Sequence, residues 1–162
     1  MLVFQYGSNV DVGRLNSPAR LDGTAKLMGL AATVEEFELR FNVYSVGQGC
    51  GVANLVPGGR KIYGALYEIP EERVVCDKGI VGLKTLDQIE GEGRSYHRNP
   101  ISICCEGNNY EAVTYLASAE TAEQKTTMLY ADHITTGLRS LEAPPEYIEY
   151  VESCIRRSLA LP

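Results

Sequence analysis

Apolar, β-branched and aromatic residues gather in short segments through the first half of the chain and predict strands there. Leu2 to Tyr6 reads as one short strand, and residues 25–45 read as mostly extended chain that is interrupted at Gly29. Two further apolar segments flank a Pro-Gly-Gly turn. We therefore expect a β-hairpin from Val52 to Ile69.

The second half alternates between helical and extended patterns. Leu83, Leu86 and Ile89 recur at helical spacing until Gly91, a residue that commonly ends helices. Strands are expected again over residues 99–106 and 110–117, which are joined by a Gly-Asn-Asn turn.

Several capping signals predict further helices. Near the start, residues 11–15 read as one helical turn, and Ser17-Pro18 as the beginning of another. Residues 70–76 also read as helix-like. In the last part of the chain, Thr121 with Gln124 forms a possible capping box for a helix that ends near Gly137, and Pro144-Pro145 begins a final amphipathic helix.

This order of strands, helices, strands and helices predicts an α+β fold in a single domain over residues 1–162. Hairpin-linked strands would form a small barrel or a strongly curved sheet with flanking helices. A hydrophobic content of 44% suffices for a core without disulfides or a structural metal.

Charge and composition narrow the function classes. The net charge is −6 and no basic cluster is present, so nucleic acid is not an expected partner. No apolar segment approaches the length of a membrane span and no signal peptide is visible, so we expect a cytoplasmic protein that does not contact a membrane. The cysteines show no metal-ligand spacing, and free buried thiols are the expected state of Cys50, Cys76, Cys104, Cys105 and Cys154.

The segment Tyr6-Gly7-Ser8-Asn9, directly after the first strand, is the first candidate site. Successive small residues after a strand can direct several backbone N–H groups into one concavity and so bind a carboxylate or a phosphate. A helical turn that starts near Val10 would add its positive end to that field. The alternative is a simple turn in which Asn9 caps a helix.

Glu90 is the second candidate. It lies at the C-terminal end of the short predicted helix and borders its apolar stripe, and both features raise the pKa of a carboxyl group. Such a glutamate suits a general base that works near neutral pH. The alternative is an ordinary exposed glutamate. Glu92, beyond the glycine, is a more solvated competitor, and Tyr96 is the first choice among the ten tyrosines for contact with a ligand.

Other polar residues lack suitable partners. His97 and His133 have none at the spacing of a metal site or a catalytic triad, and Ser8 has no His and Asp companions for nucleophilic catalysis. We therefore expect no metal site.

Taken together and in order, these segments resemble the γ-glutamylcyclotransferase-like superfamily. The resemblance rests on YGSN after the first strand and on LDxxEG followed by Tyr96 and Arg98. The strand IYGALYEI, the later strand VTYLA and the final helix PPEYIEYV are similar to the corresponding parts of that family and extend the resemblance over nearly the whole chain.

The resemblance implies a small mixed β-barrel with flanking helices and a specific reaction. The early loop would bind the α-amino and α-carboxylate end of a γ-glutamyl group, and Glu90 would be the general base. The α-amine would attack the γ-carbonyl carbon and release 5-oxoproline and an amine or amino acid, without a cofactor or a metal. The expected substrate-binding residues are Tyr6, Gly7, Ser8, Asn9, Val10 and Tyr96.

One position departs from the family. Members often carry a tyrosine near the substrate where this chain has Lys125, with Tyr130 five residues on, so the leaving group stays open. Two other functions also stay open: a non-catalytic module that binds a small acid, and a γ-glutamyl hydrolase in which Glu90 activates water. The sequence is compatible with a monomer or a homodimer.

Overall fold

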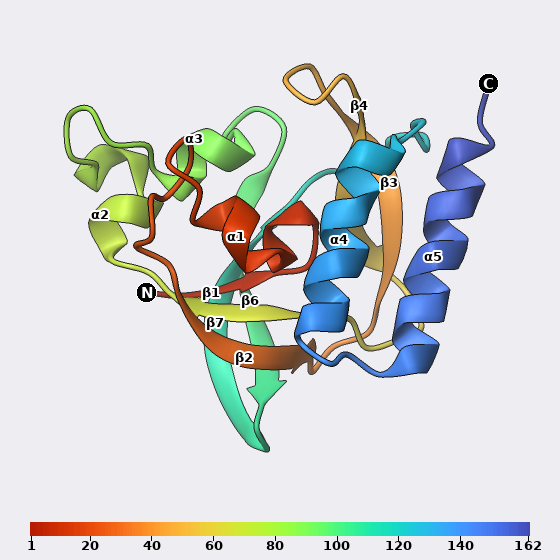
Figure 1. Cartoon of the computed structure of the whole chain (residues 1–162), viewed down its shortest axis with the longest axis horizontal. Coiled ribbons are helices and arrows are strands. Elements are labelled where there is room, and N and C mark those ends of the chain that lie inside the picture. Colours follow the sequence, from red (N-terminus) through yellow and green to blue (C-terminus); the bar gives the residue numbers. More distant parts are fainter.

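A closed barrel of five strands forms the centre of the protein, described here by a computed structural model that covers all residues, 1–162 (Figure 1). The strands follow the order β1 (Leu2–Gln5), β5 (Tyr63–Glu68), β2 (Lys26–Thr33), β6 (His97–Cys105) and β7 (Asn108–Leu116). Four of the pairings are antiparallel, and the parallel pairing of β1 with β7 closes the barrel. The α+β class and the small mixed barrel are therefore confirmed.

The two remaining strands, β3 (Phe37–Ser45) and β4 (Cys50–Pro57), form a separate antiparallel sheet. The predicted hairpin from Val52 to Ile69 is therefore wrong, because β4 pairs with β3 while β5 pairs with β1 and β2. Gly58 accounts for the difference: its ideal Cβ would lie 2.6 Å from the Glu38 backbone nitrogen. The turn is folded against β3, and residues 58–62 then carry the chain across to the barrel.

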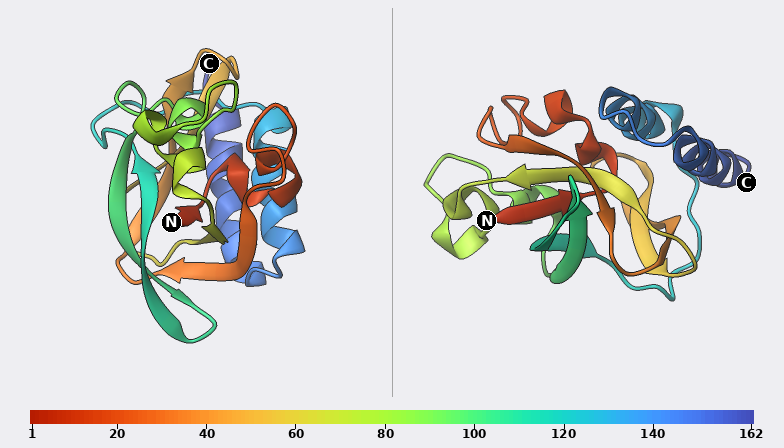
Figure 2. Two further views of the ribbon diagram at one scale, coloured as in Figure 1. Left: turned by 90° about the vertical axis from the view of Figure 1, so that its left-hand side faces the viewer. Right: turned by 90° about the horizontal axis from the view of Figure 1, so that it is seen from below.

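Two long helices, α4 (Met128–Ser140) and α5 (Pro145–Leu159), lie side by side along one side of the molecule (Figures 1 and 2). The start of α5 is as predicted, whereas the capping box at Thr121 is wrong. Thr127 caps α4 instead, because the backbone of Gln124 is already bonded to Phe41 and to Ser158. These bonds hold the preceding segment extended along the edge of β3.

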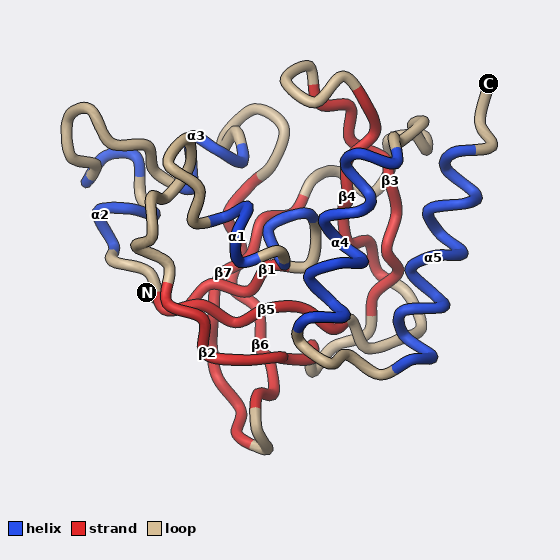
Figure 3. The backbone as a smooth tube through the Cα atoms, in the orientation of Figure 1, coloured by secondary structure: helices blue, strands red, loops and turns tan.

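The short helices are η1 (Ser8–Val10), α1 (Val12–Leu15), α2 (Glu71–Val74), η2 (Cys76–Lys78) and α3 (Leu86–Glu90). Of these, α2 and α3 lie away from α4 and α5, whereas η1 packs against α4 and α1 follows η1 along the chain (Figure 3). As predicted, α3 ends at Gly91, which has a left-handed backbone (φ 73°). It begins later than the apolar spacing suggested, because Thr85 forms a capping box with Gln88 and leaves Leu83 exposed. The helix expected at Ser17-Pro18 is a series of turns.

One continuous core joins the barrel, the β3–β4 sheet and the two long helices. All five cysteines are free, but Cys76 is exposed and Cys104 only partly buried, which corrects the expectation that all are buried. None of the helices is both long and apolar enough to cross a membrane.

Candidate active site

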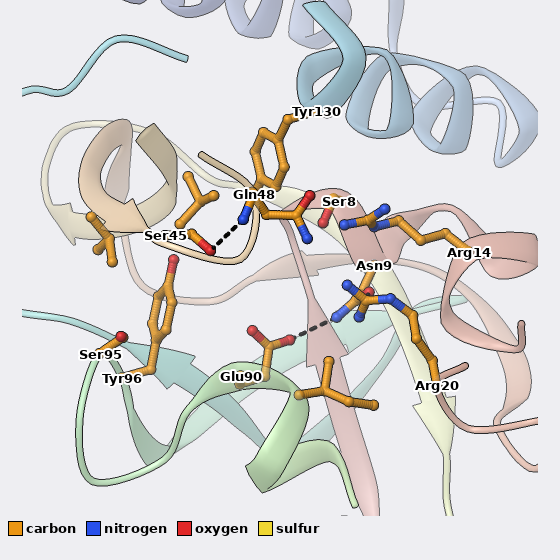
Figure 4. A pocket seen from close by; sticks show the side chains of 13 residues that line it. Ser8, Asn9, Arg14, Arg20, Ser45, Gln48, Glu90, Ser95, Tyr96 and Tyr130 are labelled. Atoms are coloured by element: carbon orange, nitrogen blue, oxygen red, sulfur yellow. Dashed lines mark hydrogen bonds between the residues drawn. The ribbon is translucent and has the colours of Figure 1, made fainter. Parts of the chain in front are cut away.

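A cavity in two connected parts lies where β1 ends, between β4, the C-terminal end of α3 and the first turn of α4 (Figure 4). Both parts share the side chains of Ser8, Asn9, Glu90, Tyr96 and Tyr130. The inner part is completed by Gln5, Tyr6, Gly7, Ala53 and Tyr115, and the outer part by Arg14, Arg20, Val43, Ser45, Gln48, Val52, Ile89 and Ser95.

The loop after β1 turns directly into the short helix η1. A Cβ at Gly7 would lie 3.3 Å from the Tyr130 hydroxyl and 3.4 Å from the Ala53 methyl group, so the close packing here favours glycine. Asn9 lies inside η1 and caps no helix; the cap of the following helix α1 is Asp11. The interpretation of Asn9 as an N-cap is therefore wrong, and its side chain is free to act in the cavity.

Asn9 connects two charged groups. Its Nδ2 donates to Glu90 Oε1 at 2.7 Å, and its Oδ1 accepts from Arg20 Nη1 at 3.0 Å (Figure 4). The Asn9 side chain is buried, so both hydrogen bonds are shielded from water. The amide thus fixes the Glu90 carboxylate and holds the Arg20 guanidinium beside it.

Glu90, the last residue of α3, directs its carboxylate into the cavity and is partly buried. Burial raises the pKa of this carboxyl above its ordinary value, because the charged form loses water. The positive charge of Arg20 and the hydrogen bond from Asn9 act in the opposite direction. Glu92 lies outside the cavity and accepts from the backbone N–H of Arg98 at 2.5 Å.

Four tyrosines wall the inner part of the cavity. The Tyr6 hydroxyl donates to the Tyr115 carbonyl at 2.5 Å and the Tyr96 hydroxyl to the Ala53 carbonyl at 2.5 Å, while Tyr130 accepts from the Ala53 N–H at 3.1 Å. Burial raises the pKa of all four phenols, so they are neutral at physiological pH. Their hydrogen bonds to the backbone fix them as a neutral wall of the inner part.

An ion pair between the buried Asp87 and the partly buried Arg98 anchors the helix that carries Glu90. The Asp87 carboxylate accepts from Arg98 Nη1 at 2.6 Å, from the Tyr115 hydroxyl at 2.7 Å and from the Cys76 N–H at 3.0 Å. Asp87 lies three residues before Glu90, so these bonds tie α3, and with it Glu90, to β6, β7 and η2. Asp87 and Arg98 both belong to the motif noted in the sequence.

The predicted site residues Tyr6, Gly7, Ser8, Asn9, Glu90 and Tyr96 all line this cavity. Val10 does not, since its side chain is fully buried in the core and its N–H donates to the Gly7 carbonyl. Lys125 is exposed and away from the cavity, whereas Tyr130 lines both of its parts.

The two histidines lie elsewhere. His133 is 2.7 Å from Asp11 Oδ2, and His97 is 3.9 Å from Glu92.

The lining residues that sequence reasoning missed include Gln5, Arg14, Arg20, Tyr115 and Tyr130. Tyr130 had a weak signal, because a tyrosine was expected in this region. The two arginines had none. Arg14 reaches the outer part of the cavity from α1, and Arg20 from the turns of residues 16–23.

Comparisons with known proteins bear on the family and the fold. A family model described as gamma-glutamyl cyclotransferase, AIG2-like, matches residues 3–134. Among solved structures, one titled gamma-glutamyl cyclotransferase is 21% identical with a TM-score of 0.79, covering 94% of this chain and 86% of that one. An uncharacterized protein from Homo sapiens is 20% identical with a TM-score of 0.78 over the same shares.

A third structure, YkqA from Bacillus subtilis, is 22% identical with a TM-score of 0.78, and the match covers 100% of this chain and 55% of that one. At these identities the structures share the fold. No curated protein sequence matches the chain significantly.

Proposed function

The chain belongs to the gamma-glutamyl cyclotransferase, AIG2-like family, and we propose that it is itself a γ-glutamyl cyclotransferase. The observation that carries the proposal is the Glu90 carboxylate, which has a raised pKa and is fixed by Asn9 beside the loop after β1. A site that only bound an acidic ligand would gain nothing from a partly buried carboxylate that faces the ligand.

In the proposed complex, the γ-glutamyl end of the substrate occupies the inner part of the cavity. Backbone N–H groups of Gly7, Ser8 and Asn9 bind its α-carboxylate, and Tyr96 and Tyr130 pack against its methylene chain. The inner part is narrow, so it favours the folded conformer in which the α-amine approaches the γ-carbonyl. Holding that conformer supplies much of the rate enhancement that intramolecular reactions show.

Glu90 then acts as the general base. Its carboxylate takes a proton from the α-amine, whose nitrogen attacks the γ-carbonyl carbon and closes the five-membered ring. Collapse of the tetrahedral intermediate breaks the bond to the leaving nitrogen, which receives the proton from Glu90. The products are 5-oxoproline and a free amine or amino acid, and no water is consumed. A carboxyl group with a raised pKa is suited both to accept the proton from the α-amine and to donate it to the leaving nitrogen.

An end-point assay tests the proposal. The purified protein is incubated with γ-glutamyl amino acids, γ-glutamyl amines and glutathione, and 5-oxoproline is measured by mass spectrometry. We expect product from at least one substrate and a loss of about 100-fold or more in Glu90→Gln, which keeps the side chain's size but cannot take up the proton.

Glu92→Gln is the matched control, because Glu92 lies outside the cavity, and it should retain activity. Release of free glutamate in place of 5-oxoproline would contradict the cyclotransferase and indicate a hydrolase. No product from any substrate, with a folded protein, would favour a binding module.

A further inference from the structure

The outer part of the cavity holds two arginines, Arg14 and Arg20, whose only nearby protein anion is Glu90, which neither of them contacts as an ion pair. Neither Arg14 nor Arg20 takes part in any ion pair of the structure. The side chain of Arg20 donates only to Asn9, and the side chain of Arg14 donates to nothing, although its Nε is buried. In a chain with a net charge of −6, two neighbouring unpaired guanidinium groups in a cavity are unexpected.

The two guanidinium groups lie next to one another and face the same space (Figure 4). Arg14 disfavours the charged form of Arg20, whose pKa is lowered mainly by burial and then by this repulsion. A buried, unpartnered nitrogen such as Arg14 Nε costs free energy that a hydrogen-bond acceptor would recover. The arrangement is therefore prepared for an anionic acceptor that comes from outside the protein.

We propose that Arg14, with Arg20, binds a carboxylate on the leaving group, so that the preferred substrates are γ-glutamyl amino acids and not γ-glutamyl amines. This inference rests on the proposed cyclotransferase function. The γ-glutamyl end occupies the inner part, beside Glu90 and the loop after β1, so the leaving group extends into the outer part, where Arg14 and Arg20 lie.

The charge balance during the reaction supports the same conclusion. Glu90 is the one acidic side chain among the residues that line the outer part, and it becomes neutral when it takes the proton. The two arginines then face no protein anion in the cavity. A carboxylate on the leaving group would compensate them throughout, and it would form the charge-assisted bonds that guanidinium groups make best.

Two substrates that differ only in this carboxylate provide the test. γ-Glutamyl-alanine and γ-glutamyl-ethylamide have the same skeleton, apart from the carboxylate that alanine carries. We expect the wild-type protein to prefer the alanine compound by about tenfold or more in kcat/KM. Arg14→Gln should remove most of that preference by lowering kcat/KM for γ-glutamyl-alanine alone. Arg14→Lys should retain part of the preference, because the positive charge remains but the planar guanidinium group is lost.

Arg156→Gln is the control for loss of one positive charge, because Arg156 is exposed on α5 and forms no ion pair, and its preference should equal that of the wild type. Equal turnover of both compounds by the wild type would overturn the inference and leave the cyclotransferase intact. An equal decrease in kcat/KM for both compounds in Arg14→Gln would also overturn the inference, because the arginine would then act on the γ-glutamyl half of the substrate.

A binding measurement separates failure of the inference from failure of the proposed function. Calorimetry on Glu90→Gln measures the affinity for both compounds when no reaction occurs. Tighter binding of γ-glutamyl-alanine that depends on Arg14 would support the carboxylate site even if the wild type released no 5-oxoproline. Equal affinities would contradict it.

Discussion

Gly137 sets how closely α4 approaches the loop that carries Ser8 and Asn9, and its replacement by alanine tests that contact. An ideal Cβ at this position would lie 2.6 Å from the Val10 carbonyl carbon and 2.6 Å from the Asp11 nitrogen. Ordinary contacts begin at 3.4 Å, so helix and loop would have to separate by about 0.8 Å. Both sides of the contact are backbone, and neither can rotate away as a flexible side chain would.

Two opposing effects decide the stability of Gly137→Ala. Alanine is favoured over glycine within a helix by about 1 kcal/mol. Overpacking of a closely packed contact costs about 1–3 kcal/mol, and a clash with backbone belongs at the upper end of that range. We therefore expect Gly137→Ala to lower the free energy of unfolding by about 1–2 kcal/mol.

Gly13→Ala is the matched control, since Gly13 lies in α1 and its nearest contact would be an ordinary 3.4 Å to Asp11 Oδ1. It should be neutral or stabilising by up to about 1 kcal/mol. Urea denaturation of the three proteins measures the difference. A displaced loop would also reduce kcat/KM, because catalysis is sensitive to small misplacements. If Gly137→Ala proved as stable as Gly13→Ala, the close approach of α4 would not position the loop.

Four further predictions concern Glu90 and its surroundings. Asp87→Asn should lower the free energy of unfolding by about 2–3 kcal/mol in urea titrations, because a buried carboxylate with three different donors is lost; unchanged stability would contradict the anchoring role of the ion pair. The kcat/KM should fall as the pH decreases through the raised pKa of Glu90, because the base is then protonated. A plot of kcat/KM against pH that shows no such decrease at acidic pH would contradict the assignment of the base. The pKa of Glu90 is higher in the folded protein than in the unfolded chain. The contribution of Glu90 to the free energy of unfolding is therefore fully present below its pKa in the unfolded chain and is lost as the pH rises through its pKa in the folded protein. The Tm of Glu90→Gln relative to that of the wild type should accordingly increase with pH. Asn9→Ala should move the acidic decrease in kcat/KM to higher pH, since the hydrogen bond from Asn9 lowers the pKa of Glu90. A decrease at the same pH as in the wild type would show that Asn9 does not act on the base.

The sequence predicted the elements of this fold better than their pairing. The turn at Pro57-Gly58-Gly59 was identified, but a glycine turn between two apolar segments does not reveal whether they pair with each other. Here Gly58 packs against the backbone of β3, so β4 stays paired with β3. The chain then leaves this sheet, and β5 joins the barrel. The prediction of the N-cap of α4 was wrong for a related reason, because hydrogen bonds of Gln124 to residues distant in sequence hold the preceding segment extended.

The local part of the site was predictable, and the part assembled by tertiary contacts was not. The position of Glu90 before Gly91, on a short amphipathic helix, already indicated a raised pKa, and the structure shows that burial is its main cause. Arg20 gave no such signal, because it is connected to Glu90 only through Asn9 and the turns of residues 16–23. Tyr130 reaches the cavity from the first turn of α4, which begins later than the sequence suggested.

The central claim is that Glu90 removes the proton that allows the γ-glutamyl group to cyclise. The most direct measurement is the amount of 5-oxoproline formed from γ-glutamyl-alanine by the wild type and by Glu90→Gln, with the released alanine quantified in the same samples. The account predicts equal amounts of 5-oxoproline and alanine from the wild type and at least about 100-fold less of both from the variant. Wild-type levels of product from Glu90→Gln would contradict it.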